Sequence, residues 1–394
     1  MYRVSKVKWN PFSEGYLQNP YKHVNLCRET NPIQKILPDS YMFFSYKDVS
    51  QILKSDNVNA FSISNYLKTK ESRIFKNTNS CPFLSKSTEM WSLYLNDEVH
   101  SIVRKSMTKA FHKQPLQEIF QDCLEKTLLE YKNQSNFDLV DFCVKFKYYI
   151  VCEIFNLNEI GFESVKELSS QLAEFQSIYN TKKFYQSLND NILIRKPSFD
   201  GDSIFKQIIT EEAKNLSLEP DQVYSVLLAS FMAAFEATKN NLILSIVQIL
   251  RNKDLTEFAI SMDNKSKKML FQENIRFNSV AQYSVRENSE PFEINDIKIP
   301  EKSKLYLCIA SANRDENIFT KANTFIPQRD KNPHLGFGEG IHKCIGKGIA
   351  QMEVDICLQP MINFLKDYSI ETVSWSKQFF MRTPNQILIS KKGI

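Results

Sequence analysis

Residues 334–348 read HLGFGEGIHKCIGKG and hold five of the nine glycines of this 394-residue chain, together with two histidines and one cysteine. Glycine is used where the backbone needs a positive φ or must lie close against another group. A glycine-rich loop that ends on Cys344, just before a helical run, can press its backbone against a flat partner and present one sulfur to it. Haem iron ligated by a thiolate is the partner that this pattern favours.

Three other interpretations of the loop compete with a haem site. The Gly-x-Gly spacing resembles a phosphate-binding turn, but no Val/Ile-rich strand precedes it and no Gly-Lys-Ser/Thr ending follows. His342 and Cys344 could be two zinc ligands, although no C-x-x-C pair or second His cluster supplies the remaining ligands. Cys344 could also be a buried structural thiol, which is the usual role of an intracellular cysteine.

The loop resembles the haem-binding signature of the cytochromes P450, in the pattern Phe337-Gly338-x-Gly340-x-His342-x-Cys344-x-Gly346. Ala350 and Glu353 fall where the following helix of that family usually has them, whereas Gln351 stands where an Arg is commoner. The resemblance implies one mainly α domain over residues 1–394, with a small β region and a long central helix over the haem. It also implies haem b (iron protoporphyrin IX) with Cys344 as the metal ligand.

Composition is compatible with this class. No apolar stretch of 18 residues and no apolar N-terminal signal region are present, which predicts a cytoplasmic protein without a membrane segment. The net charge of +5 does not by itself indicate nucleic-acid binding. Eight cysteines are scattered singly, and the seven other than Cys344 are expected to be buried free thiols in a reducing compartment.

Most of the chain has a helical pattern, with helices expected at residues 97–113, 115–133 and 137–156. A strand followed by a helix is expected near residues 41–49, several helical pieces within 162–216, and a hairpin over 368–392. The longest helix is predicted over residues 220–251, because Pro220 suits a first turn and no later Gly or Pro interrupts the run.

Glu236 lies in the middle of that helix, within an apolar run where an unpaired carboxylate is costly. Helical spacing places it on one face with three further residues: Ala233, Ala237 and Asn240. Small residues on that face would let a planar cofactor lie against the helix. The alternative is a glutamate that is satisfied by a partner in the core.

The resemblance makes this the oxygen-activation helix, in which an acid is followed by a Thr. Glu236 matches the acid, but Ala237 replaces the Thr, and Thr238 lies one position further on. Thr238 would point about 100° away on an α-helix, so it cannot simply substitute. Glu236 and Thr238 are nevertheless the candidate catalytic residues, and Ala233 and Ala237 are expected to face the haem.

The two haem propionates would need cationic or hydrogen-bonding partners. His100 and Arg104 lie at i and i+4 on a predicted helix, and the resemblance matches them, Arg286 and His334 to propionate contacts. Glu273 and Arg276 form an E-x-x-R pair that resembles a structural ion pair of the family. We interpret that pair as scaffold.

Lysines recur near the predicted proximal face. Lys105, Lys109 and Lys113 share one side of a helix, while Lys343 and Lys347 flank the cysteine. A solvated helix face is the simpler interpretation. The chain has no flavin or iron–sulfur pattern, so the resemblance implies electrons from a separate protein, an acidic ferredoxin or flavodoxin steered by this basic patch.

The resemblance implies monooxygenation of a small organic molecule, with secondary-metabolite tailoring as the expected setting. Because Ala237 replaces the usual Thr, a second hypothesis is a non-hydroxylating oxidation, such as oxidative coupling, nitration or peroxide-driven turnover. A third is a haem-binding protein without turnover, and a fourth is a structural or metal-binding α protein without haem.

Overall fold

The computed structural model describes residues 6–62, 67, 82–157, 160–175, 181–199 and 201–393. The chain divides into two compact units. Unit 1 comprises residues 1–61, 261–344 and 373–385, and unit 2 comprises residues 62–260, 345–372 and 386–394. Each unit is assembled from segments far apart in the sequence, so no linker marks the division. The single domain over residues 1–394 stays a prediction.

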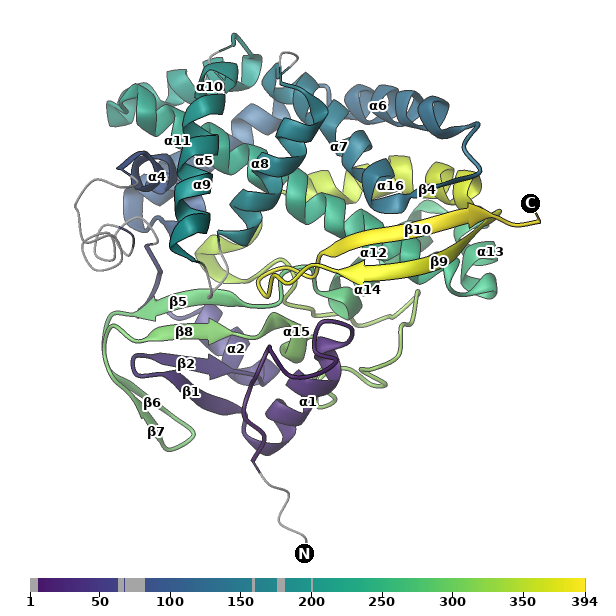
Figure 1. Cartoon of the computed structure of the whole chain (residues 1–394). Coiled ribbons are helices and arrows are strands. Elements are labelled where there is room, and N and C mark those ends of the chain that lie inside the picture. The colour runs from purple at the N-terminus through teal and green to yellow at the C-terminus, as the bar shows by residue number, and fades with distance from the viewer. Residues whose placement is uncertain are drawn as a thin grey trace, which may run out of the picture. The chain divides into compact units, whose positions relative to one another are not determined.

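Unit 1 is built on a five-stranded sheet in the order β1-β2-β8-β5-β3, of which Figure 1 shows β1, β2, β8 and β5 in succession. β2 and β8 run parallel, whereas the other neighbours are antiparallel. The strands of unit 1 are β1 (Ile33–Leu37), β2 (Ser40–Phe43), β3 (Val58–Ala60), β5 (Ser284–Asn288), β6 (Phe292–Ile294), β7 (Ile297–Ile299) and β8 (Lys304–Leu307). Its helices are α1 (Pro20–Thr30), α2 (Tyr46–Leu53), α14 (Asn264–Asn278) and α15 (Ile309–Ala312).

The strand and helix predicted near residues 41–49 are confirmed as β2 and α2. All four residues of β2 are buried, as a continuous apolar run predicts for a strand covered on both faces. The side chain of Ser45 caps α2 by accepting a hydrogen bond from the Asp48 backbone N–H. Leu53 of α2 then packs into the same apolar cluster as Phe43 of β2.

Unit 2 is mainly helical. The helices predicted at 97–113, 115–133 and 137–156 are confirmed as α5, α6 and α7, each within two residues of the expected ends. The helices of unit 2 are α4 (Pro82–Thr88), α5 (Asp97–His112), α6 (Leu116–Tyr131), α7 (Leu139–Phe155), α8 (Phe162–Glu174), α9 (Lys182–Arg195), α10 (Ile204–Ala213), α11 (Pro220–Met232), α12 (Thr238–Leu250), α13 (Lys253–Ser261) and α16 (Lys347–Leu365). Short 3₁₀ turns are η1 (Ser92–Tyr94), η2 (Lys196–Phe199) and η3 (Lys214–Leu216).

The helix predicted over residues 220–251 is continuous, but it is not α-helical throughout. α11 and α12 are joined by a π-helical segment, η4 (Ala233–Ala237), which contains Glu236. Pro220 occupies the first turn as predicted, and the Gln222 side chain accepts a hydrogen bond from the Glu219 backbone N–H at 3.0 Å. π-helical turns are rare and occur frequently at functional sites.

The C-terminal hairpin is confirmed as β9 (Tyr368–Trp375) and β10 (Pro384–Lys391), which join β4 (Asn136–Asp138) in a three-stranded sheet of order β4-β10-β9. In the described part of the chain, no helix is both long and apolar enough to cross a membrane. The architecture is therefore mainly α with a small β region, as the sequence predicts.

Candidate active site

The loop before Cys344 needs glycine at two positions, because of its backbone angles and its close contact with α2. Gly338 and Gly340 have φ of +66° and +70°, a region that other residues rarely adopt. A Cβ on Gly340 would lie 2.4 Å from the Leu53 carbonyl oxygen, so the loop there lies directly against the end of α2. The Cys344 backbone N–H donates to the Phe337 carbonyl at 2.8 Å, which closes the loop, and the Cys344 side chain is exposed.

The loop is fastened to unit 1 at both ends of its glycine run. The Leu335 backbone N–H donates to Asn313 Oδ1 at 2.7 Å. Ser50 Oγ donates to Glu339 Oε2 at 2.6 Å, and Lys54 Nζ lies 3.2 Å from the same oxygen. Because these anchors come from two segments far apart in the sequence, the end of α2 and Asn313, the loop backbone that precedes the sulfur has little freedom to move.

The Glu273–Arg276 pair on α14 is the scaffold that the sequence predicts. Both side chains are fully buried, and Arg276 Nε and Nη2 each donate to a Glu273 carboxylate oxygen at 2.8 Å. Arg276 also donates to the carbonyls of Asn313, Ala322 and Thr324. Since Asn313 in turn holds Leu335, this network fixes the start of the cysteine loop.

His334 and Phe337 both contact α14, the helix that carries the Glu273–Arg276 pair. Gly336 N–H donates to His334 Nδ1 at 3.2 Å, so Nε2 carries the proton that is shared with Gln272 Oε1 at 3.0 Å. The Phe337 ring packs 5.9 Å from that of Phe271 on α14, measured between centroids. His342 ends a 3₁₀ turn, η5 (Gly340–His342), two residues before the cysteine.

Arg286 on β5 is a buried cation without a carboxylate partner in the described residues. It is 5% exposed, and its Nη1 donates only to Ser284 Oγ at 3.0 Å and to the Val285 carbonyl at 2.9 Å. Burial lowers the pKa of this guanidinium from 12.5 to about 10. A buried guanidinium with neutral partners is a site that an anionic group would stabilise.

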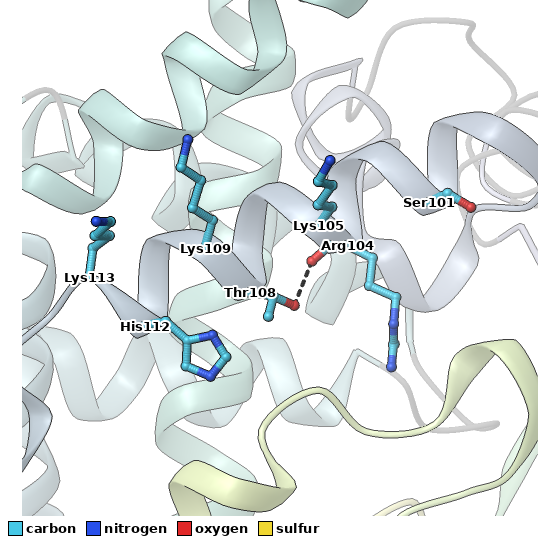
Figure 2. A pocket seen from close by; sticks show the side chains of 7 residues that line it. All are labelled: Ser101, Arg104, Lys105, Thr108, Lys109, His112 and Lys113. Atoms are coloured by element: carbon cyan, nitrogen blue, oxygen red, sulfur yellow. Dashed lines mark hydrogen bonds between the residues drawn. The ribbon is translucent and has the colours of Figure 1, made fainter.

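Helix α5 carries the other predicted cations of the cofactor site, in unit 2. His100 is buried and Arg104 is half-buried. Figure 2 shows Arg104 and His112 directed to the side of α5 opposite Lys105 and Lys109. Six side chains of α5, Arg104 and His112 among them, line a groove of about 850 Å³ together with Lys113, the C-cap of that helix.

The lysine row on α5 is only partly as predicted. Lys105, Lys109 and Lys113 are all exposed, but Lys109 forms an ion pair with Glu212 of α10. This hydrogen-bonded pair raises the pKa of Lys109 and lowers that of Glu212. Much of the Lys109 charge is thus neutralised within unit 2, and the surplus positive charge of this face lies at Lys105 and Lys113.

The prediction that Ala233, Glu236, Ala237 and Asn240 share one face is wrong in part. It assumed α-helical spacing, whereas the π-helical segment changes the rotation per residue between these positions. Ala233 is exposed and Ala237 is half-buried, but Glu236 is only 1% exposed. Glu236 therefore lies toward the core of unit 2, where its surroundings differ from those of the alanines.

Glu236 has specific partners in the core, whereas the sequence suggested only that some partner could satisfy its carboxylate. Lys239 Nζ donates to both carboxylate oxygens at 2.8 Å, and Ser169 Oγ of α8 donates to Oε1 at 2.9 Å. The Lys239 side chain is 7% exposed, so this is a buried ion pair. Sequence reasoning missed Lys239, although an i, i+3 Glu–Lys pair inside an apolar run was a detectable signal.

Thr238 uses its hydroxyl within the helix. Its Oγ1 donates to the Ala234 carbonyl at 2.7 Å, which satisfies an oxygen inside the π-helical segment. The donor capacity of this hydroxyl is therefore committed, and Ala237 has no hydroxyl at all. In this structure neither residue presents a free hydroxyl proton.

Each unit contains described residues of the kind that would hold the haem implied by the resemblance. Unit 1 supplies an exposed sulfur on an anchored loop and a buried guanidinium, that of Arg286, whose hydrogen-bond partners among the described residues are all neutral. Cys344 also lies three residues before Lys347, where α16 begins, and a helix N-terminus favours a thiolate. Unit 2 supplies the cations of α5 and the small residues of η4.

Comparisons with known proteins agree with this fit. A family model described as Cytochrome P450 matches residues 245–394. The "Biotin biosynthesis cytochrome P450" of Bacillus subtilis (strain 168) is 24% identical, over 92% of this chain and 93% of that protein.

Two solved structures share the fold. One is P450BioI in complex with an acyl carrier protein ligated to hexadec-9Z-enoic acid, with a TM-score of 0.81, 21% identity, and coverage of 96% of this chain and 99% of that one. The other is cytochrome P450epoK bound to epothilone B, with a TM-score of 0.83, 19% identity, and coverage of 98% and 100%.

Fold and cysteine loop together define the class of oxidoreductases that hold haem through a thiolate. Residues 245–394 match the Cytochrome P450 family model, and the chain as a whole is similar to proteins of that family in sequence and fold.

Proposed function

We propose that this protein is a monooxygenase that inserts one oxygen atom from O₂ into a small organic molecule, as a tailoring step of secondary metabolism. The exposed Cys344 sulfur on its anchored loop is the observation that carries the proposal. Relatives support an organic substrate, since one solved neighbour holds epothilone B and another an acyl chain on a carrier protein.

The cysteine loop and the buried polar residues would hold the cofactor. Haem b, bound through the Cys344 thiolate, would supply the activation of O₂. Phe337, Gly338, His342 and Gly346 shape the loop around the sulfur, and the buried Arg286 would pair with a haem propionate. Arg104 presents a further cation, His100 a further hydrogen-bonding group, and His334 braces the loop through Gln272.

Electrons are proposed to come from a ferredoxin or flavodoxin. Lys105 and Lys113 on α5, with the exposed Lys343 and Lys347, are the positive side chains that would steer an acidic donor. Reversing the charge of Lys105 and Lys113 should slow reduction, with a loss that shrinks as salt rises. Lys109, which is paired with Glu212, is the matched control and should matter less. Equal losses at all three positions would contradict this assignment.

A second candidate function has a specific observation in its favour. Ala237 has no hydroxyl, and the Thr238 hydroxyl donates to the helix backbone. A proton route for hydroxylation would then need Glu236 with water or a substrate hydroxyl. A non-hydroxylating oxidation, such as oxidative coupling, nitration or peroxide-driven turnover, does not need that route to be intact.

The first experiment is the carbon monoxide difference spectrum of the dithionite-reduced protein. A strongly red-shifted Soret band that is lost in Cys344→Ala supports the thiolate site. Oxygen consumption in a fixed ratio to a hydroxylated product then supports monooxygenation, whereas a coupled or nitrated product supports the second function. A haem spectrum without thiolate character indicates a haem-binding protein, and no haem spectrum overturns the proposal.

A further inference from the structure

We propose that Lys239 is a positioning residue that holds Glu236 ionised and directed toward α8, so that any proton handled by Glu236 passes through this clamp. The inference deepens the proposed function and rests on it, because it concerns the acid of the same helix. No other charged partner of Glu236 or Lys239 is found in the described residues.

The clamp is complete at the carboxylate. Glu236 Oε2 receives Lys239 Nζ at 2.8 Å, and Oε1 receives both Lys239 Nζ at 2.8 Å and Ser169 Oγ at 2.9 Å. Three donors on two oxygens fix both the rotamer and the charge, because hydrogen bonds to the charged form of a carboxylate favour that form. At 1% exposure, water contributes little to this stabilisation.

A purely structural role accounts poorly for such a pair. Replacing a buried ion pair by apolar residues of similar volume is often neutral or stabilising, so stability alone gives little reason for two charges here. The pair also spans the end of the π-helical segment, with Glu236 inside η4 and Lys239 in the first turn of α12. Local departures from the α-helix at such places are frequently functional.

Removal of the Lys239 ammonium should change the protonation of Glu236. In Lys239→Met the Glu236 carboxylate would stay buried with Ser169 as its only donor, and a buried unpaired carboxylate takes up a proton. Glu236 would then be a neutral acid with a freer rotamer. Lys239→Arg keeps a cation beside the carboxylate and should keep Glu236 ionised.

Infrared spectroscopy tests the protonation state without turnover. The difference between Lys239→Met and Lys239→Met/Glu236→Gln should show the C=O stretch of a protonated carboxyl group at neutral pH, shifted in D₂O. The difference between wild type and Glu236→Gln should show none. Absence of the band in the Lys239→Met pair overturns the proposal, whatever the enzyme catalyses.

Turnover tests the positioning role. Lys239→Met should lower kcat roughly tenfold or more, within the range of one proton-transfer group, with KM unchanged and more peroxide released per electron consumed. Lys239→Arg should restore most of kcat. The control is Lys196→Met, which breaks another ion pair of unit 2, between Lys196 of η2 and Asp221 at the start of α11, twelve residues before η4 begins. Equal losses of kcat in both methionine variants would mean a structural effect only and overturn the proposal.

If Lys239→Met does not fold, Ser169→Ala carries the test, because it removes one donor and leaves the charges balanced. The expected loss in kcat is about fivefold, the share of one hydrogen bond, with KM unchanged. Unchanged kcat in Ser169→Ala would overturn the clamp. Failure of the proposed function is distinguishable from failure of the clamp, because it would appear in the wild-type protein as the lack of a thiolate-type carbon monoxide spectrum.

Discussion

Two buried Glu–cation pairs at i, i+3 spacing, Glu273–Arg276 in unit 1 and Glu236–Lys239 in unit 2, differ in how firmly they are held. The Arg276 guanidinium donates to three backbone carbonyls besides Glu273, and Arg329 reinforces the carboxylate at 3.0 Å. The Lys239 ammonium donates only to Glu236 in the described part of the chain. One pair joins several chain segments, while the other joins two adjacent turns of one helix.

The difference follows from the chemistry of the two cations. A guanidinium has five donors in a planar fork, so it can serve a carboxylate and several carbonyls at once. An ammonium is a compact charge on a flexible stem, which suits a group that must hold one partner. We therefore expect the first pair to fix structure and the second to fix a charge.

The largest expected effect is the loss of Arg276. Arg276→Met leaves three buried carbonyls without their donor and weakens the anchor of the cysteine loop, at a cost of about 4 kcal/mol or more. Urea unfolding monitored by circular dichroism would measure this loss. Arg276→Lys keeps the charge but not the fork, and should lose somewhat less. A surface substitution typically changes the free energy of unfolding by less than about 1 kcal/mol. A loss that small in Arg276→Met would contradict the scaffold role.

Removing both partners of each pair sharpens the comparison. Glu236→Gln/Lys239→Met should change the free energy of unfolding by only about 1 kcal/mol, because no backbone group depends on that pair. Glu273→Gln/Arg276→Met should remain destabilised by about 3 kcal/mol, because the orphaned carbonyls stay buried. Equal effects of the two double substitutions would show that the pairs do not differ in kind.

Arg286 extends the comparison to a buried cation with no carboxylate. Its folded pKa of about 10 lies below the ordinary 12.5, so burial of the charged form destabilises the haem-free protein at every pH below about 10. That penalty, about 2–3 kcal/mol, should be relieved as pH rises from 10 toward 12.5.

Arg286→Met should therefore stabilise the haem-free protein at pH 7 and abolish its gain in stability above pH 10, as measured by urea unfolding. The same variant should release haem about tenfold faster to an excess of a haem scavenger, since a charge-assisted contact is lost. Faster haem loss without any gain in apoprotein stability would argue against an unpaired charge at this position.

The sequence predicts the local features of this molecule well. The cysteine loop is short, and the need for Gly338 and Gly340 is set by backbone angles that are encoded locally. Helices α5, α6 and α7 and the hairpin were predicted because their apolar spacing or alternation is itself the cause of the element. The scaffold role of Glu273 and Arg276 was inferred from the family resemblance, because the spacing alone occurs on many solvated helices.

What the sequence does not reveal depends on partners that fold in from elsewhere. Ser169 is 67 residues from Glu236, and Glu212 is 103 from Lys109, so neither contact has a local signature. The orientation of Glu236 was mispredicted because no residue pattern in the sequence marks the π-helical segment, so α-helical spacing was assumed across it. The two-unit division escaped notice because both units are built from interleaved segments.

The smallest expected effect concerns one buried cysteine in each unit. Cys143 on α7 is fully buried, and burial raises the pKa of its thiol, while the Lys239 charge acts to lower it. Burial likewise raises the pKa of Cys308 in unit 1 to about 12. At pH 8 both thiols are therefore almost entirely protonated and should react slowly with iodoacetamide, since the thiolate is the nucleophile.

Substitution at the two pairs should separate these thiols. Lys239→Met removes a charge that favoured the Cys143 thiolate and frees no backbone, so Cys143 should stay as unreactive as in wild type. Arg276→Lys loosens unit 1, so Cys308 should be alkylated several-fold faster through local opening. Peptide mass spectrometry after timed alkylation distinguishes the two sites. Rapid labelling of Cys143 in Lys239→Met would show that this pair also supports the packing of α7, and the contrast between a structural pair and a charge-holding pair would no longer stand.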